Sequence, residues 1–227
     1  MTNDNPTPRL DAVLFDMDGV LADSEVQWNA IDAAMLAEQG VEYHGEHKEH
    51  VLGKSFPLAL QFYIDTYGLT QSIEQLQSQR TAIAMDYYAT RIDAFPAVAH
   101  VLTDLKAMGL RLAVATSSVG ALARPFLERH GITHFFDAII TGEEVTRGKP
   151  HPDIYLLAAR KVNAMPANCL VVEDALAGVQ AGKSAAMRVA AIPDARWIDP
   201  QLFIGKADYF LNDLAELTGL VARLRAG

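Results

Sequence analysis

Short apolar runs alternate along this chain with longer stretches in which apolar residues recur every three or four positions. Residues 10–15 are typical of a buried strand. Comparable runs occur at residues 110–115, 136–140, 169–172 and 187–192, with a weaker one at 209–211. Helical patterns separate these runs, and the connections are short. The alternation predicts an α/β core of Rossmann-like type, a parallel sheet with helices on both faces.

One segment breaks this alternation. From Ser24 to about Ile92 the pattern is helical without a convincing strand, and Trp28 falls on one of the helical faces. A segment of this length is too long for an ordinary crossover between two strands. We therefore expect residues 24–92 to form a helical subdomain, inserted into a core built from residues 1–23 and 93–227.

Composition narrows the choice of partners. The chain has 227 residues, half of them hydrophobic, which is enough to bury a substantial core. Its 28 acidic and 19 basic residues give a formal net charge of −9, which repels nucleic acid and anionic membranes over most of the surface. We expect no nucleic-acid partner and no membrane partner. A bound phosphate must be held locally, by a few cations and backbone N–H groups.

The cellular setting follows from what the sequence lacks. Cys169 is the single cysteine, so no intramolecular disulfide can form, which suits a reducing cytosol. Residues 1–9 are polar and do not resemble a signal peptide. No apolar stretch approaches the ~20 residues of a membrane span. These features predict a cytoplasmic protein, with a monomer as the default expectation.

The strongest chemical signal is a pair of carboxylates, Asp16 and Asp18, just after the first predicted strand. Ligand sites of open parallel sheets lie outside the carboxyl ends of the strands. Two carboxylates there could bind a divalent cation or divide the roles of nucleophile and acid. Gly19 would let the chain turn sharply away from the sheet. An acidic turn without function is the plainer alternative, and a calcium-binding loop fits poorly because its sixth position needs glycine and here is Leu21.

Hydroxyl groups follow a second predicted strand. Thr116 and Ser117 come after the run at residues 110–115, ahead of a helical pattern. Hydroxyls and free N–H groups at a helix start suit a phosphate oxygen. Because Ser and Thr are also ordinary helix N-caps, this signal alone does not establish a site.

A lysine and a second acidic pair complete the set. Lys149 stands between a glycine and a proline before a helical stretch, where its ammonium could neutralise a phosphate and a carboxylate, although a solvated loop lysine looks the same. Glu173 and Asp174 end a buried strand without a basic neighbour, which is costly unless a cation binds. Asp174 could instead cap the next helix.

Together the four signals supply what phosphoryl transfer needs. The sequence contains no P-loop, no dinucleotide-binding fingerprint and no nucleophile elbow that would indicate a different chemistry.

In this order, the Asp-x-Asp-Gly, strand-end Thr, Lys-Pro and Glu-Asp motifs resemble those of the haloacid dehalogenase (HAD) superfamily of phosphatases. The resemblance covers nearly the whole chain, and the helical insert resembles the cap of the β-phosphoglucomutase-like branch. Residues 23–25, 149–152 and 173–178 are similar to that branch. Trp28 and residues 186–188 are similar to bacterial hexitol and 2-deoxyglucose-6-phosphate phosphatases.

The resemblance implies a magnesium-dependent phosphatase that acts on a small phosphorylated metabolite, such as a sugar or polyol phosphate. Asp16 would be the nucleophile that forms an aspartyl-phosphate. Asp18 would protonate the leaving oxygen and then activate water. Thr116, Ser117 and Lys149 would hold the phosphoryl oxygens.

The same resemblance implies a metal site and a specificity region. Asp16, the backbone carbonyl of Asp18, and Asp174 would bind Mg²⁺. Glu173 would bind the ion either directly or through a water molecule. Specificity would come from the helical insert. The candidate residues there are Trp28, Lys54 and Ser55.

Two other functions stay open. A β-phosphoglucomutase-type mutase needs a second phosphate site on the cap, and the mutases of this branch carry an arginine three residues after a glycine that matches Gly53. Here that position is Phe56, and Trp28 stands where those enzymes carry a histidine. The alternative of another class is a catalytically retired binding or regulatory protein, against which the intact Asp16 and Lys149 argue.

Overall fold

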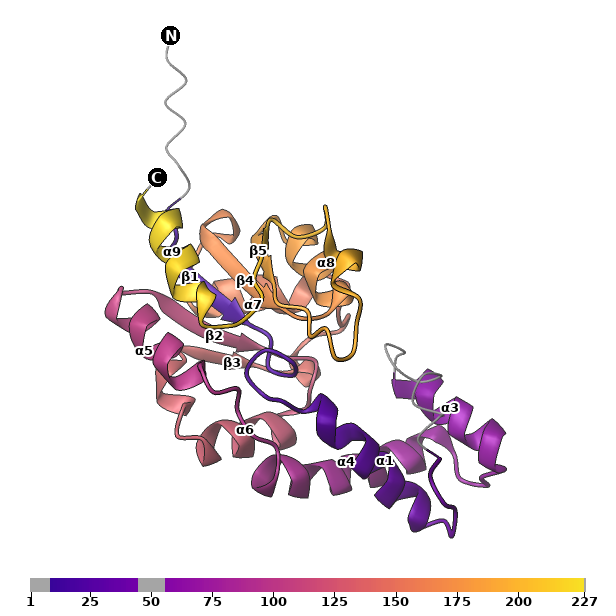
Figure 1. Cartoon of the computed structure of the whole chain (residues 1–227). Coiled ribbons are helices and arrows are strands. Elements are labelled where there is room, and N and C mark those ends of the chain that lie inside the picture. The colour runs from indigo at the N-terminus through magenta and orange to yellow at the C-terminus, as the bar shows by residue number, and fades with distance from the viewer. Residues whose placement is uncertain (1–8, 45–55, 227) are drawn as a thin grey trace. The chain divides into compact units, whose positions relative to one another are not determined.

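The computed structural model describes residues 9–44 and 56–226 (Figure 1). The chain divides into two compact units. One unit joins the residues up to Asp23 with those from Asp93 onward, and the other comprises Ser24–Ile92. None of the described helices has both the length and the hydropathy that a membrane span requires.

The first unit is built on a parallel sheet. Within the described residues the sheet has six strands in the order β3-β2-β1-β4-β5-β6, and all neighbouring pairs are parallel. The strands are β1 (Ala12–Phe15), β2 (Arg111–Ala115), β3 (Ala138–Ile140), β4 (Cys169–Glu173), β5 (Arg188–Ala191) and β6 (Tyr209–Phe210). This confirms the α/β parallel-sheet core expected from the apolar runs.

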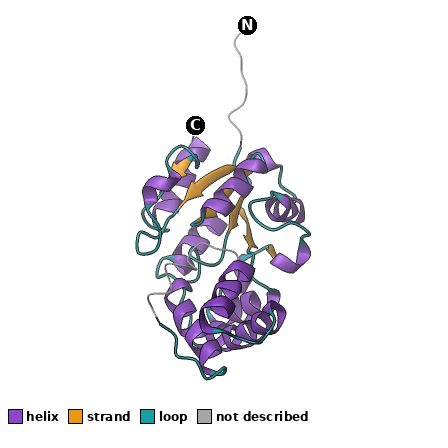
Figure 2. Cartoon of the chain, turned by 90° about the vertical axis from the view of Figure 1, so that its right-hand side faces the viewer, coloured by secondary structure: helices purple, strands orange, loops and turns teal. Residues whose placement is uncertain are grey.

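Helices lie on both sides of the strands (Figure 2). The helices of this unit are α5 (Val98–Ala107), α6 (Gly120–Arg129), α7 (Asp153–Lys161), α8 (Leu176–Ser184) and α9 (Glu216–Ala226). Short 3₁₀ turns connect them at η2 (Thr133–Phe135), η3 (Gly142–Glu144), η4 (Pro166–Asn168) and η5 (Pro200–Phe203). Strands β1 and β4 are buried along their whole length, which explains why their sequences are continuous apolar runs.

The two faces of the sheet are distinguished by alternate strand residues. Leu14 of β1 and Val171 of β4 belong to one buried cluster with residues of α7 and α8. Val13 and Phe15 point to the other face and are fully buried there. Phe15 meets the ring of Phe136 edge to face at 6.2 Å. The residues that follow β1 and β4 inherit this alternation, which decides where the functional side chains point.

The second unit is helical throughout its described part. Its helices are α1 (Glu25–Ala37), α3 (Phe56–Tyr67) and α4 (Ile73–Thr90). Buried apolar side chains from all three helices form its core. A buried polar group stands beside that core, because Asp32 accepts hydrogen bonds from the Tyr63 hydroxyl at 2.8 Å and from Arg80 at 2.5 Å. A capping box at Ser72 and Gln75 begins α4.

Candidate active site

The four sequence signals meet at one edge of the sheet. Asp16 follows β1, Thr116 follows β2, Glu173 is the last residue of β4, and Asp174 follows it. Because β1 lies between β2 and β4 and all three strands are parallel, their carboxyl ends are neighbours.

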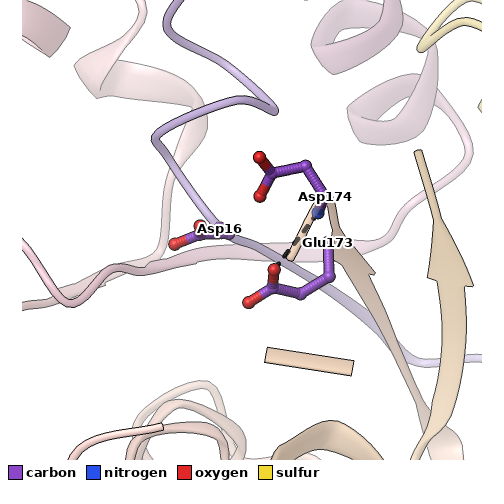
Figure 3. A group of neighbouring side chains, drawn as sticks. All are labelled: Asp16, Glu173 and Asp174. Carbon is purple, nitrogen blue, oxygen red and sulfur yellow. Dashed lines mark hydrogen bonds between the residues drawn. The ribbon is translucent and has the colours of Figure 1, made fainter. Parts of the chain in front are cut away.

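Three carboxylates form the centre of the site (Figure 3). Asp16, Glu173 and Asp174 each offer one carboxylate oxygen, and these oxygens lie within 4.8 Å of one another. Glu173 is fully buried and Asp16 is 8% exposed. Such a group cannot stay ionised in a dry environment without nearby positive charge.

Lys149 supplies part of that charge. Its ammonium donates to Asp16 Oδ1 at 2.8 Å and to Glu173 Oε1 at 2.7 Å. Only 7% of the side chain is exposed. The strand alternation explains the shared contact, since Asp16 and Glu173 continue the face of the sheet that carries Leu14 and Val171.

Burial and the neighbouring charges shift the pKa values of Asp16, Asp174 and Lys149. Burial raises the pKa of Asp16 to about 7, against the attraction of Lys149 and with further repulsion from Glu173. Burial and the carboxylates of Glu173 and Asp16 raise the pKa of Asp174 well above its ordinary value. Burial alone would lower the pKa of Lys149, but Asp16 and Glu173 outweigh it and the pKa is raised.

The excess of negative charge in this cluster suits the binding of a divalent cation. Three carboxylates and one ammonium leave two formal negative charges when all are ionised. A group with oxygen ligands close together and an excess of two negative charges suits Mg²⁺. Asp16 and Asp174 are the residues best placed to hold such an ion, because Glu173 has other partners.

Glu173 is saturated with hydrogen-bond donors. Its Oε1 accepts from Lys149 and, at 2.6 Å, from the Tyr155 hydroxyl. Its Oε2 accepts from the backbone N–H groups of Asp174 and Ala175 at 3.1 and 3.2 Å. Each oxygen therefore has two donors, which is the number of its lone pairs. In this arrangement Glu173 anchors Lys149.

Tyr155 is a site residue that the sequence reasoning missed. It is fully buried, and the Lys149 ammonium lies 5.1 Å from the centre of its ring. Burial and the charge of Glu173 raise its pKa well above the ordinary value, so the hydroxyl remains a donor. The sequence signal that could have found it is helical spacing, since Tyr155 and Ala158 lie on the buried face of α7 and Val162 is its buried C-cap.

Two glycines make room for the acidic side chains. A Cβ at Gly178 of α8 would lie 1.6 Å from Glu173 Oε1, and one at Gly19 would lie 1.9 Å from Asp174 Oδ2. Gly19 also has a φ of +77°, as expected for the sharp turn after β1. Asp174 does not cap the following helix, because α8 has Ala175 as its N-cap and no side-chain capping bond.

The hydroxyl segment after β2 separates into distinct environments. Thr116 is buried, and its Oγ1 accepts from the backbone N–H of Ser118 at 3.0 Å. Ser117 is exposed. Ser118, which the sequence reasoning did not single out, is buried and donates its hydroxyl to Asp18 Oδ2 at 2.7 Å. None of these residues caps α6, whose N-cap is Val119 without a side-chain bond.

The residues expected to set specificity are only partly described. Lys54 and Ser55 lie outside the described residues, as does the side chain of Phe56. Trp28 packs within its own unit, where the Arg80 guanidinium lies 4.2 Å from its ring centre and the Tyr88 ring 6.1 Å away. A role for Trp28 toward a substrate stays a prediction.

The first unit also has a cavity of about 960 Å³. Its walls include Phe95, Ile192 and Phe210. Gly19 and Val20, in the turn that follows β1, also line it, so the cavity borders this turn, although Asp16, Lys149, Glu173 and Asp174 are not among its lining residues.

The chain is similar to known hydrolases along most of its length. Residues 13–192 match the family model described as haloacid dehalogenase-like hydrolase. Hexitol phosphatase B of Escherichia coli (strain K12) is 30% identical over 220 residues, covering 93% of this chain and 96% of that protein. The phosphorylated carbohydrates phosphatase of Thermotoga maritima is 30% identical over 176 residues, covering 78% of this chain and 82% of the relative. The crystal structure of CbbY from Rhodobacter sphaeroides in complex with phosphate has a TM-score of 0.78 at 27% identity, covering 92% of this chain and 96% of that one.

Proposed function

The chain belongs to the haloacid dehalogenase-like hydrolase family, and we propose that it is a magnesium-dependent phosphatase of small phosphorylated metabolites. The observation that carries the proposal is the buried cluster of Asp16, Lys149, Glu173 and Asp174 at the carboxyl ends of β1 and β4. A nucleophile, a fixed cation and an acidic pocket for a divalent ion are the parts that phosphoryl transfer requires.

Asp16 is the nucleophile in this proposal. One of its carboxylate oxygens bonds to phosphorus while the bond from phosphorus to the ester oxygen breaks, and Asp18 gives that oxygen a proton. Water then attacks phosphorus and gives a proton to Asp18, while the bond between phosphorus and the Asp16 oxygen breaks. Inorganic phosphate leaves, and the Asp16 carboxylate is regenerated. Lys149, already 2.8 Å from Asp16, and the buried hydroxyl of Thr116 hold the phosphoryl oxygens, and Ser117 offers a backbone N–H.

Asp16, Asp174 and the backbone carbonyl of Asp18 would hold Mg²⁺. When bound, the ion neutralises charge on the phosphoryl group and orients it toward Asp16. Glu173, whose oxygens already accept four hydrogen bonds, contributes negative charge beside the ion and keeps Lys149 in place.

The substrate we propose is a sugar or polyol phosphate. Two relatives are a hexitol phosphatase and a phosphorylated carbohydrates phosphatase. CbbY has been solved in complex with xylulose-(1,5)bisphosphate at 28% identity to this chain. Residues 24–92 would act as the cap that selects the substrate. Lys54→Ala and Ser55→Ala test this more cleanly than a change at Trp28, which packs against Arg80.

The proposed setting is that of a monomeric cytoplasmic enzyme. The single cysteine suits a reducing compartment, and the net charge of −9 disfavours nucleic acid and anionic membranes. Size-exclusion chromatography with light scattering tests the monomer, and a dimer mass would contradict it.

A panel of sugar and polyol monophosphates, assayed for inorganic phosphate with and without Mg²⁺, tests the function. We expect magnesium-dependent release from at least one ester, with Asp16→Asn as the inactive control. Wild-type protein that releases no phosphate from any ester would contradict the proposal and favour a binding protein.

The mutase alternative needs its own measurement. Phe56 cannot grip a second phosphate as an arginine would. We therefore expect β-glucose 1-phosphate, given with a bisphosphate primer, to yield phosphate without efficient conversion to glucose 6-phosphate. Isomerisation much faster than phosphate release would instead identify a mutase.

A further inference from the structure

Ser118 is held in place by three hydrogen bonds. Its hydroxyl donates to Asp18 Oδ2 at 2.7 Å, and its backbone N–H donates to Thr116 Oγ1 at 3.0 Å. Its carbonyl accepts from the N–H of Gly142 at 3.1 Å. The residue is 8% exposed. A donor fixed this firmly restricts the group that it contacts.

Asp18 needs such restriction. It lies in the turn that follows β1, with Gly19 next to it at a φ of +77°, and its side chain is half-buried. The hydrogen bond from Ser118 joins this turn to the segment after β2, across one hundred residues of sequence. This hydrogen bond favours one rotamer of the Asp18 carboxylate, and proton transfer requires a particular rotamer.

A hydroxyl suits a group that changes its protonation state. It can donate to an ionised carboxylate and accept from a protonated one, because it carries one hydrogen and two lone pairs. A lysine ammonium or a backbone N–H can only donate, so it could not accept a hydrogen bond from the protonated carboxyl. The contact can therefore persist while Asp18 gives up a proton and later takes one back.

We propose that Ser118 is a positioning residue that orients Asp18 for proton transfer to the leaving oxygen; this inference rests on the phosphatase function proposed above. In the step concerned, the ester P–O bond breaks, the O–P bond to Asp16 forms, and the proton passes from Asp18 to the departing oxygen. The need for that proton depends on the leaving group. An alkoxide cannot depart without it, whereas p-nitrophenolate is stable as an anion.

Leaving-group dependence supplies the test. Ser118→Ala, Ser118→Cys and Ser118→Thr are compared with wild type using p-nitrophenyl phosphate and sorbitol 6-phosphate, or whichever alkyl monophosphate of the panel wild type hydrolyses fastest. The measured quantity is kcat/KM, which covers the steps up to departure of the leaving group. Ser184→Ala, at the exposed end of α8, is the control for loss of a serine hydroxyl.

We expect Ser118→Ala to lose about 10–100-fold on the alkyl ester, part of what a general acid contributes, and less than about threefold on the aryl ester. Ser118→Thr should restore most of the loss, and Ser118→Cys, with its weak S–H donor, should fall between. Equal losses on the two esters would reduce Ser118 to a structural role and overturn the inference. So would unchanged activity, or a gain, which would mean that the contact holds Asp18 away from its task.

The activity of the wild-type protein tests the phosphatase function independently of the role of Ser118. A wild type active on both esters upholds the phosphatase, and the Ser118 series then decides the positioning role. A wild type inactive on every ester overturns both. Thermal melts of each variant confirm folding, and the threonine variant keeps the test valid if the alanine variant does not fold.

Discussion

At the residue scale, Asp16 combines two properties that rarely coincide. It is buried at the end of a central strand, and yet its proposed role requires the ionised form. Burial raises its pKa to about 7, and the ammonium of Lys149 at 2.8 Å opposes that rise. A cation bound beside Asp16 would favour the carboxylate further. In the proposed mechanism, metal binding would therefore leave the Asp16 carboxylate fully ionised.

Asp16→Asn should keep the fold and lose nearly all turnover. The amide has the shape of the carboxylate but neither its charge nor its nucleophilic oxygen. We expect kcat below about a tenth of the wild-type value, a conservative bound for loss of a nucleophile. Phosphate release measures activity, and circular dichroism with a thermal melt checks the fold. Turnover above that bound would contradict the covalent mechanism.

Cys169 is a core residue, as its place in an apolar run predicted. It is fully buried, and burial raises the pKa of its thiol from 9.0 to about 11. Between these values the folded protein keeps the proton that the unfolded chain loses. The folded state then binds more protons, so stability falls as pH rises from about 9 toward 11.

This burial gives a simple prediction for the thiol. Native protein at pH 8 should react slowly with a disulfide reagent such as dithionitrobenzoate, and one equivalent should react at once in denaturant, because the chain has a single cysteine. Absorbance of the released thiolate measures both rates. Equal rates would show that Cys169 is accessible in the folded state.

At the element scale, the starts of α7 and α8 shape the acidic site. Tyr155 in the first turn of α7 donates to Glu173, and Gly178 in the first turn of α8 leaves room for the same carboxylate. Both helices pack on the face of the sheet toward which Glu173 points. A change in how either helix packs would therefore reach Lys149 through Glu173.

Gly178→Ala tests how closely α8 packs against Glu173. Alanine normally favours a helix over glycine by about 0.5–1 kcal/mol. Here its Cβ would lie 1.6 Å from Glu173 Oε1, so Glu173 or α8 must move. We expect a lower melting temperature and at least about a tenfold loss of kcat, since misplacement by about 1 Å can cost 10²-fold.

Gly219→Ala is the matched control in α9. Its Cβ would meet nothing closer than 3.7 Å, at the end of the Arg223 side chain. It should raise stability by about 0.5–1 kcal/mol and leave activity unchanged. If both variants have the same effect on the melting temperature and on kcat, the close approach of Gly178 to Glu173 does not matter for stability or activity.

At the scale of the whole molecule, charge is distributed unevenly. The chain carries a net charge of −9, and the cluster of Asp16, Glu173 and Asp174 concentrates negative charge around one buried lysine. The protein therefore attracts a divalent cation to this cluster more readily than an anionic ester. Metal binding should precede or accompany the binding of a phosphorylated substrate.

Removal of metal should abolish activity and lower stability. We expect phosphate release to vanish with a chelator and to return with Mg²⁺, while Ca²⁺ substitutes poorly because it prefers more oxygens at longer distances. Mg²⁺ should also raise the melting temperature, because it binds the folded state. Asp174→Asn should weaken this shift. Full activity after rigorous chelation would exclude the metal role of Asp174.

Much of this molecule was predictable from local patterns. The apolar runs marked all of the described strands, and the helical periodicity marked the inserted segment, because both signals depend on residues close in sequence. The carboxylates, the hydroxyls and Lys149 stood at strand ends or helix starts. Since the carboxyl ends of parallel strands share one edge, chain order alone indicated that these groups would meet.

Contacts between distant elements were beyond such patterns. Ser118 meets Asp18 across one hundred residues, and Tyr155 meets Glu173 from a helix that crosses the sheet. For a serine after a strand or a tyrosine on a helix, the neighbouring sequence does not indicate which residue it will contact. Those partners depend on the strand order, which places β1 between β2 and β4, and on the way α7 and α8 pack against one face. Residue types and their spacing thus specify the chemistry that can occur, whereas packing of the chain in three dimensions specifies which groups orient it.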